Sequence, residues 1–326
     1  MAQARGAKAQ LSCASESTFK TLGTLNPQVI PIVSESIKAS RDLVSSAIIR
    51  GNRNPYQPVL GQKEISGDIT TNLSPYLGKL FYHLLGGKAS TGTTIPYTHT
   101  LTVSDLPTGL TIQKAFSDVG QYFVYKGCKI NSMKITARPT GFVETTFSIM
   151  GADMALYTSS QITAPTDYTQ SNVGGSFTGY TISLNEGGSS LGIGTEVDLT
   201  IENNLDGSVF VINGTGTRYS IPEGLVKVSG TLRALFESET LLNKAINGTE
   251  SSLALTFQHG TGAGAANNEK LIITVDELIY KPQDPVISGP AGIMLELAFE
   301  GYFQNGSSSS AVSFTLVNTQ TGNDLL

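Results

Sequence analysis

The chain has 326 residues and a net charge of −5, and only 14% of its residues are charged, against about 25% in typical soluble domains. The absence of a Lys and Arg block excludes tight nucleic-acid binding, and no apolar run approaches the ~18 residues that cross a bilayer. The N-terminus lacks the apolar core of a secretory signal, so we expect a cytosolic chain or one that leaves the cytosol without a signal. So few charges indicate a surface that is covered by copies of the same chain.

The first half begins with a long strand pair, expected from Val33 to Ile49 and followed by a turn-rich stretch from Arg50 to Gln62. The next stretch, KEISGDITTNLSPYLGKLFYHLLGG from Lys63 to Gly87, has the pattern of strand, turn and helix. Ser74 before Pro75 predicts the helix start, and the closing glycine pair predicts its end. We expect the helix to bury four side chains with helical spacing: Leu77, Leu80, Phe81 and Leu84.

The second half has the same order of elements. A long strand pair is expected from Glu196 to Ile212, followed by a turn-rich stretch from Asn213 to Gly224. The stretch VKVSGTLRALFESETLLNKAINGT, from Val226 to Thr249, again predicts a strand and a helix, with Ser238 as the cap and Gly248 as the stop. The expected buried face of this helix is Leu241, Leu242, Ala245 and Ile246.

These echoes predict a duplicated, mainly β fold. The Ser-Gly pairs that begin at Ser66 and Ser229 are 229 − 66 = 163 residues apart, half of the chain, and two late strands align at Gly151 and Gly301. We therefore expect two tandem strand-rich modules, each with one flanking α-helix. Residues 1–160 form the first module with an N-terminal arm, residues 161–179 the linker, and residues 180–326 the second module with a C-terminal tail. Such modules keep open sheet edges, which are templates for association.

Residues that support catalysis are not grouped in this sequence. His83, His99 and His259 are far apart, and the two cysteines lack metal-ligand spacing, so neither a metal nor another cofactor is expected. Ser190 lies in a Gly-x-Ser-x-Gly match, but that motif requires a helix after the serine, and a strand is expected there. We expect no enzyme; a hydrolase centred on Ser190 is the alternative, which a Ser190→Ala variant tests.

One stretch is similar to a known family. DLPTGLTIQKAFSDVGQYFVYKGCKINSMKITARPTGFVETTFSIMGADM, from Asp105 to Met154, resembles the tail tube proteins of tailed bacteriophages. Members carry Leu-Thr-Ile, a Gly-Gln-Tyr-like turn, and then Gly-Cys-Lys-Ile-Asn-Ser before the closing strands. ESTFKTLGT and EISGDITTNLSP look like the same family, so the match spans most of Glu16 to Met154. The second half matches chiefly through its echo of the first.

The resemblance implies a structural role without catalysis: curved β-sandwich modules form rings that stack into a hollow tube. The implied partners are copies of the chain, a tape-measure protein, a tail terminator, and genomic DNA that passes through the lumen without specific binding. The implied location is the virion tail, assembled in the cytoplasm of the host bacterium. Family rings present six modules, so three chains could close one ring; six chains that each place one module in the wall remain the alternative.

Strand alternation supplies candidates for the lumen wall. DNA slides without sticking past a neutral or acidic wall, because each Lys or Arg on a phosphate adds salt-dependent adhesion. Five acidic residues alternate with apolar ones on two strands: Glu196, Asp198, Glu202, Glu296 and Glu300. An outer, solvent-facing position for these residues is an equally open interpretation.

The loop from Arg50 to Leu60 is the candidate for reaching a neighbouring ring, because it follows the long strand. Its candidate contact residues are Arg50, Arg53, Pro55 and Tyr56, and an ordinary hairpin tip is the alternative. A second function also stays open, that of a non-catalytic receptor- or carbohydrate-binding β-sandwich of a virion. Such a site needs clustered aromatic residues, whereas this chain has no Trp and its 12 Tyr are spread out.

Overall fold

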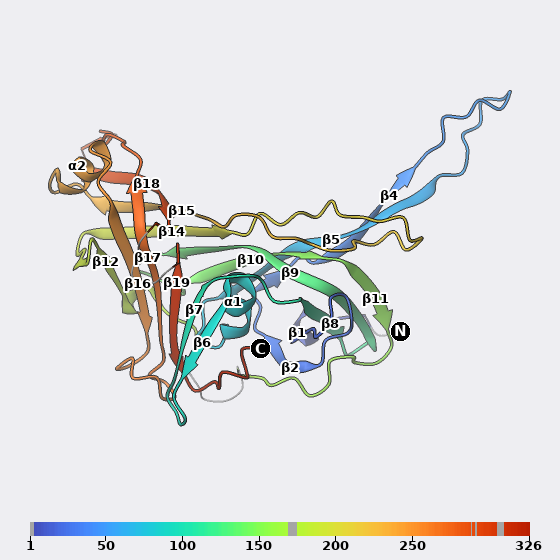
Figure 1. Ribbon diagram of the computed structural model, residues 1–326, viewed down its shortest axis with the longest axis horizontal. Coiled ribbons are helices and arrows are strands. Elements are labelled where there is room, and N and C mark those ends of the chain that lie inside the picture. The colour runs from blue at the N-terminus through green and yellow to red at the C-terminus, as the bar shows by residue number, and fades with distance from the viewer. Residues whose placement is uncertain (1–2, 169–174, 288, 291, 305–309) are drawn as a thin grey trace.

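The computed structural model of the chain describes residues 3–168, 175–287, 289–290, 292–304 and 310–326 (Figure 1). The strands of the first half are β1 (Ala9–Ser15), β2 (Leu25–Ile30), β3 (Ser34–Glu35), β4 (Lys38–Val44), β5 (Val59–Asn72), β6 (Gly86–Thr91), β7 (Tyr97–Val103), β8 (Leu110–Phe116), β9 (Gln121–Ala137), β10 (Glu144–Gly151) and β11 (Asp153–Tyr157). Those of the second half are β12 (Ile182–Glu186), β13 (Ser189–Ser190), β14 (Gly194–Glu202), β15 (Lys227–Leu235), β16 (Ser251–Gln258), β17 (Lys270–Tyr280), β18 (Met294–Tyr302) and β19 (Ser313–Asn318). The α-helices are α1 (Gly78–Leu85) and α2 (Thr240–Ile246), so the expected mainly β fold is confirmed.

The first half is a sandwich of two antiparallel sheets that share the long strand β9. One sheet has the order β4-β5-β10-β9, and the other has the order β2-β1-β8-β9-β11. The N-terminal part of β9 pairs with β8 and β11, and its C-terminal part pairs with β10. A strand of 17 residues can serve both sheets because it bends where a register shift interrupts its pairing with β10.

The second half repeats this pairing order strand for strand. Its sheets are β14-β15-β18-β17 and β13-β12-β16-β17-β19, and β17 takes the shared position that β9 has in the first half. The hairpin of β6 and β7 has no such counterpart among the described strands. It pairs instead with β19 and so ties the first half to the second.

The hydrogen-bond register shows that single residues at equivalent positions in the two halves have equivalent partners. Gly151 lies opposite Ile65 in the ladder of β10 and β5, and Gly301 lies opposite Val228 in the ladder of β18 and β15. Val228 is 228 − 65 = 163 residues after Ile65, the spacing of the Ser-Gly pairs. A Cβ at Gly151 would lie 2.7 Å from Cγ2 of Ile65, and one at Gly301 would lie 3.1 Å from Cγ1 of Val228. Both glycines therefore make room for a β-branched side chain on the partner strand.

Helix α1 buries its whole predicted face. Leu77, just before the helix, and Leu80, Phe81 and Leu84 within it are at most 3% exposed, and burial of four such side chains contributes roughly 6–12 kcal/mol. The ring of Phe81 packs edge-on against Phe314 of β19, with ring centroids 5.2 Å apart, so this helix belongs to a core that both halves share. The helix begins at Gly78, later than Ser74 predicted, and Gly86 ends it with a positive φ of 87°.

Helix α2 is less buried than expected. Leu241 and Ala245 are buried, and Leu242 is half-buried against the core. Ile246 is 56% exposed, so its assignment to the buried face is wrong. The helix has only seven residues, and Ile246 is its last, with Asn247 after it as the C-cap. Ser238 lies one residue outside the helix cap, which is Glu239.

The segment between the halves is partly built into the sandwich. Thr166 exchanges backbone hydrogen bonds with Pro27 and Val29 beside β2, and Phe177 is fully buried. The expected linker, residues 161–179, also includes residues 169–174, which lie outside the described residues. The two long strand pairs are shorter than expected, because regular pairing stops at Val44 in one and at Glu202 in the other. The chain continues from each as an extended arm.

Candidate assembly surface

One face of the sheet carries polar residues across both halves, and we call it the polar face. Residues that lie directly opposite each other in antiparallel strands share a face, and the register runs from Lys134 through Thr200, Ser229 and Glu300 to Ile279. A hollow of about 670 Å³ lies along this stripe. Carboxylates outnumber cations among the paired residues of the polar face: Glu64, Asp68, Glu144, Glu196, Asp198, Glu202, Glu277, Glu296 and Glu300 against Lys38, Lys129, Lys134, Lys227 and Arg233.

The five acidic residues that the sequence singles out, Glu196, Asp198, Glu202, Glu296 and Glu300, all lie on the polar face. Glu196 is the best compensated of them, because Arg233 Nη1 lies 2.6 Å and Arg138 Nη2 lies 3.0 Å from its Oε1. The hydrogen bond from Arg138 lowers the pKa of the Glu196 carboxyl. Arg233 Nε also lies 3.1 Å from Glu296 Oε2, so this end of the face is a network of alternating charges.

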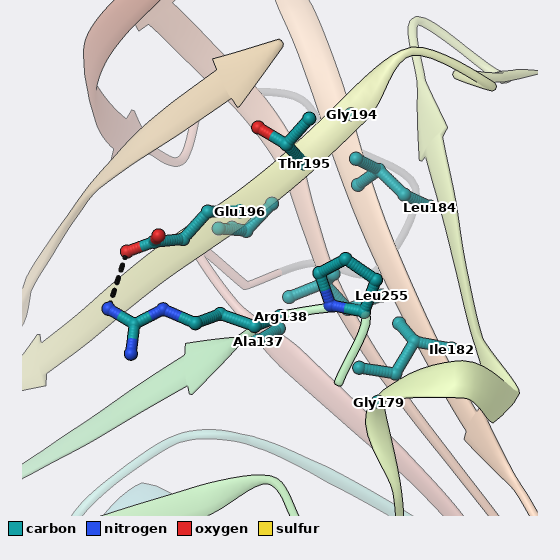
Figure 2. A pocket seen from close by; sticks show the side chains of 11 residues that line it. Ala137, Arg138, Gly179, Ile182, Leu184, Gly194, Thr195, Glu196 and Leu255 are labelled. Atoms are coloured by element: carbon teal, nitrogen blue, oxygen red, sulfur yellow. Dashed lines mark hydrogen bonds and ion pairs between the residues drawn. The ribbon is translucent and has the colours of Figure 1, made fainter. Parts of the chain in front are cut away.

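The two halves are joined edge to edge by β9 and β14. Six residue pairs form this ladder, from Ala137 opposite Val197 to Ser132 opposite Glu202. A pocket of about 80 Å³ lies at its open end, with Leu184 and Leu255 on one side and the ion pair of Arg138 and Glu196 on the other (Figure 2). The ladder shows how one half receives the edge strand of another.

An arm from the second half, residues 203–226, lies across the first half; we call it the second arm (Figure 1). Leu205 and Ile221 of this arm form a small buried cluster with Ala152, against which Met150 and Phe19 pack. Glu223 of the arm forms an ion pair with Lys129 of β9, with 2.9 Å between Oε2 and Nζ. The arm therefore covers the end of the polar face in the first half.

Arg218 anchors the second arm. Its side chain is buried, with Nη1 donating to the carbonyl oxygens of Ile65 at 3.0 Å and Gly151 at 2.7 Å, and with Nε donating to Gly207 at 2.7 Å. Burial lowers the pKa of the guanidinium, which reflects the cost of removing a charge from water. No pattern in the sequence points to this residue, because Arg218 lies in a turn-rich stretch and the residue 163 positions earlier is Pro55.

An equivalent arm from the first half extends into solvent (Figure 1); it consists of the end of β4, the loop after it and the start of β5, and we call these residues, 41–60, the first arm. All four residues predicted to reach a neighbouring ring lie at its exposed tip: Arg50, Arg53, Pro55 and Tyr56. The guanidinium of Arg50 lies 4.4 Å from the Tyr56 ring centroid and donates to the carbonyl oxygens of Asn54 and Pro55. The tip is thus ordered by its own contacts, whereas Ile48 and Ile49 are exposed by 69% and 94%.

Two sheet edges are open in the part of the chain that the structure describes. Strand β4 pairs with β5 on one side only. At the other end, β18 pairs with β17 from Phe299 to Tyr302, and the N–H of Lys281 donates to the carbonyl oxygen of Ala298. Beyond that bond, the described part of β18 has only β15 as a partner. The two open edges lie at opposite ends of the same series of strands.

Neither a nucleophile elbow nor a metal site forms among the described residues. Ser190 ends the exposed two-residue strand β13 and is followed by β14, so the helix that the elbow requires is not there. The three histidines lie in different parts of the fold: His83 is hydrogen-bonded to Ser15, His99 to Ser90, and His259 to Glu269. The described residues contain neither a group of three metal-ligand side chains nor a helix long and apolar enough to span a membrane.

Open edges, exposed apolar arms and a tandem sandwich define a structural β protein that associates with copies of itself. The chain belongs to the phage tail tube protein family, whose family model matches residues 6–301. A search of curated proteins found no match. Membership makes the chain a structural component of the virion tail that self-assembles into a tube.

Proposed function

We propose that three copies of the chain close one ring of the tube. The supporting observation is the ladder between β9 and β14, because β4 has the position in the first half that β14 has in the second, and β17 corresponds to β9. The strands of one chain run in the series β4-β5-β10-β9-β14-β15-β18-β17. The two ends of this series correspond to the two strands of the ladder that joins the halves, β14 and β9. In the ring, β4 of each copy lies beside residues 282–287 of the next copy, which follow β17 and correspond to residues 132–137 of β9, the part of that strand that pairs with β14.

The size of such a ring fits a DNA conduit. Eight strands in each of three copies give 3 × 8 = 24 strands, whereas barrels of about 16–18 strands leave only a water channel. Ring closure also removes both open edges, which removes the template for uncontrolled pairing. Residues 1–160 and 180–326 are the two modules of this wall, with residues 161–179 as their connection.

The polar face is the proposed lumen wall, because the opposite face packs into the core. Its excess of carboxylates repels phosphates and lets DNA slide, and Glu196, Asp198, Glu202 and Glu296 contribute to this field. The proposed contacts are therefore with copies of the chain, with a tape-measure protein and tail terminator, and with genomic DNA in transit. Assembly takes place in the host cytoplasm, rings stack through the exposed tips of the first arms, from Arg50 to Tyr56, and no catalysis is involved.

Negative-stain microscopy of the purified chain across a range of concentrations tests this function. We expect rings at low concentration and stacked tubes at high concentration, with a mass of 3 × 34.4 ≈ 103 kDa for the smallest closed species in sedimentation. A chain that stays monomeric at every concentration contradicts the proposal.

A further inference from the structure

We propose that the first arm of one copy lies across the second half of the next copy, on the surface that matches the one its own second arm covers. The inference rests on the proposed edge-to-edge association and adds the docking surface and its occupant. The occupant is a second copy of this chain, because the chain itself contains the template for the contact.

The strand registers give the correspondence of the two arms. Lys38 lies opposite Ser66 and Thr200 lies opposite Ser229, so the outgoing strands differ by 200 − 38 = 162 residues and the returning strands by 229 − 66 = 163. Ser34 opposite Thr70 and Glu196 opposite Arg233 give the same two offsets. The correspondence therefore holds along the whole base of each arm.

Equivalent residues on the two arms differ in burial. Leu205 of the second arm is 9% exposed, whereas its equivalent Leu43, at 205 − 162 = 43, is 66% exposed. Glu223 is held by its ion pair with Lys129, whereas its equivalent Leu60, at 223 − 163 = 60, is 58% exposed. The first arm thus presents leucines at the positions where the second arm makes its contacts.

The surface that the second arm covers in the first half is an open hollow in the second half. In the first half, Gly207 of the second arm lies against the thioether of Met150, and Glu223 reaches Lys129. The late strands differ by 301 − 151 = 150 residues, so the equivalents of Met150 and Lys129 are Glu300 and Ile279. Both residues line the hollow of about 670 Å³. The described part of the chain places no arm of its own over this hollow.

The chemistry of the new contact also matches. The ion pair of Glu223 and Lys129 inside the chain becomes an apolar pair of Leu60 and Ile279 between chains, so neither version of this residue pair leaves a charge facing an apolar group. Leu43 and Leu60 lie opposite each other in the ladder of β4 and β5 and enter the hollow from the same face. Glu300 is then covered by the arm and does not line the lumen.

Chemical cross-linking tests the placement in the full-length chain. The double variant Leu60→Cys with Ile279→Cys is assembled and treated with a short bismaleimide. A linker is needed because the equivalent pair inside the chain, Glu223 with Lys129, meets through two long side chains, whereas cysteine side chains are short. We expect covalent trimers, because each copy links to two neighbours around the ring. The control carries Leu60→Cys with Ile272→Cys, on the same strand but outside the hollow. Cys13 and Cys128 are at most 1% exposed and stay unreacted.

Each outcome decides the proposal. Trimers from the Ile279 variant and none from the Ile272 control support it. Rings that form in the microscope without this cross-link, or equal cross-linking of both variants, overturn the arm placement and leave the tube function intact. Absence of rings from the unmodified chain overturns the proposed function as well. In a second measurement, Leu43→Asp is expected to raise the concentration needed for ring formation at least tenfold, whereas Leu43→Met leaves it unchanged; no effect of Leu43→Asp also contradicts the placement.

Discussion

Replacement of Arg218 by Met is expected to release the second arm without unfolding the protein. Methionine keeps the length and apolar stem of arginine but removes the three hydrogen bonds to the carbonyl oxygens of Ile65, Gly151 and Gly207. Hydrogen bonds to a charged group are worth about 1.5–3 kcal/mol each, and the desolvation cost of the buried guanidinium offsets part of this. A net loss of about 3–4 kcal/mol in the docking of the arm follows.

Hydrogen exchange of the dilute, unassembled chain measures this loss. Every 1.4 kcal/mol is a factor of ten, so amides of the arm such as Leu205, Tyr219 and Gly224 should exchange about 10²- to 10³-fold faster. Amides in the ladder of β5 and β10 should keep their protection. The control is Arg53→Met at the exposed tip of the first arm, for which we expect no change. Unchanged exchange of the second arm in Arg218→Met would refute the role of Arg218.

Burial and the nearby Lys79 lower the pKa of His83, so below about pH 6.5 the unfolded chain binds a proton that the folded chain does not. The free energy of unfolding therefore decreases as the pH falls below about 6.5. His83→Gln should reduce the slope of the unfolding free energy against pH in this range by about 1.4 kcal/mol per pH unit, and equal slopes for the two proteins would contradict this. Gly301→Ala places a Cβ 2.7 Å from Val275 Cγ1 and should cost about 1–3 kcal/mol in denaturant unfolding, whereas Gly6→Ala, with open space around it, should cost nothing measurable. Tubes of Glu144→Lys with Glu202→Lys should retain duplex DNA at low salt and release it at high salt, and tubes of the matching Gln variants should retain none; DNA retention by the Gln tubes would argue against an electrostatic cause.

The parts of the fold that follow from local chemistry were predictable from the sequence. Leu77, Leu80, Phe81 and Leu84 repeat with helical spacing, and all four are buried. Gly151 and Gly301 could be aligned because a glycine opposite a β-branched residue leaves the same sequence pattern in both halves. The five acidic residues alternate with apolar ones, so their common face followed from the period of a strand.

Features that depend on contacts between distant segments could not be predicted in this way. Ile246 continues the apolar stripe of α2, but it is exposed, because burial at the last residue of a helix depends on which distant segments reach it. The role of Arg218 depends on carbonyl groups 67 and 153 residues away, and no local pattern reports such partners. The pairing of β7 with β19 and the burial of Phe177 likewise arise only when both halves have folded together.

Cryo-electron microscopy of the assembled tube, at a resolution that separates strands, tests directly how the copies are arranged. We predict three chains in each ring, a continuous wall of 24 strands, and a joint between copies with the register of the β9 and β14 ladder. Six chains in each ring, or a wall to which only one half of each chain contributes, would contradict it.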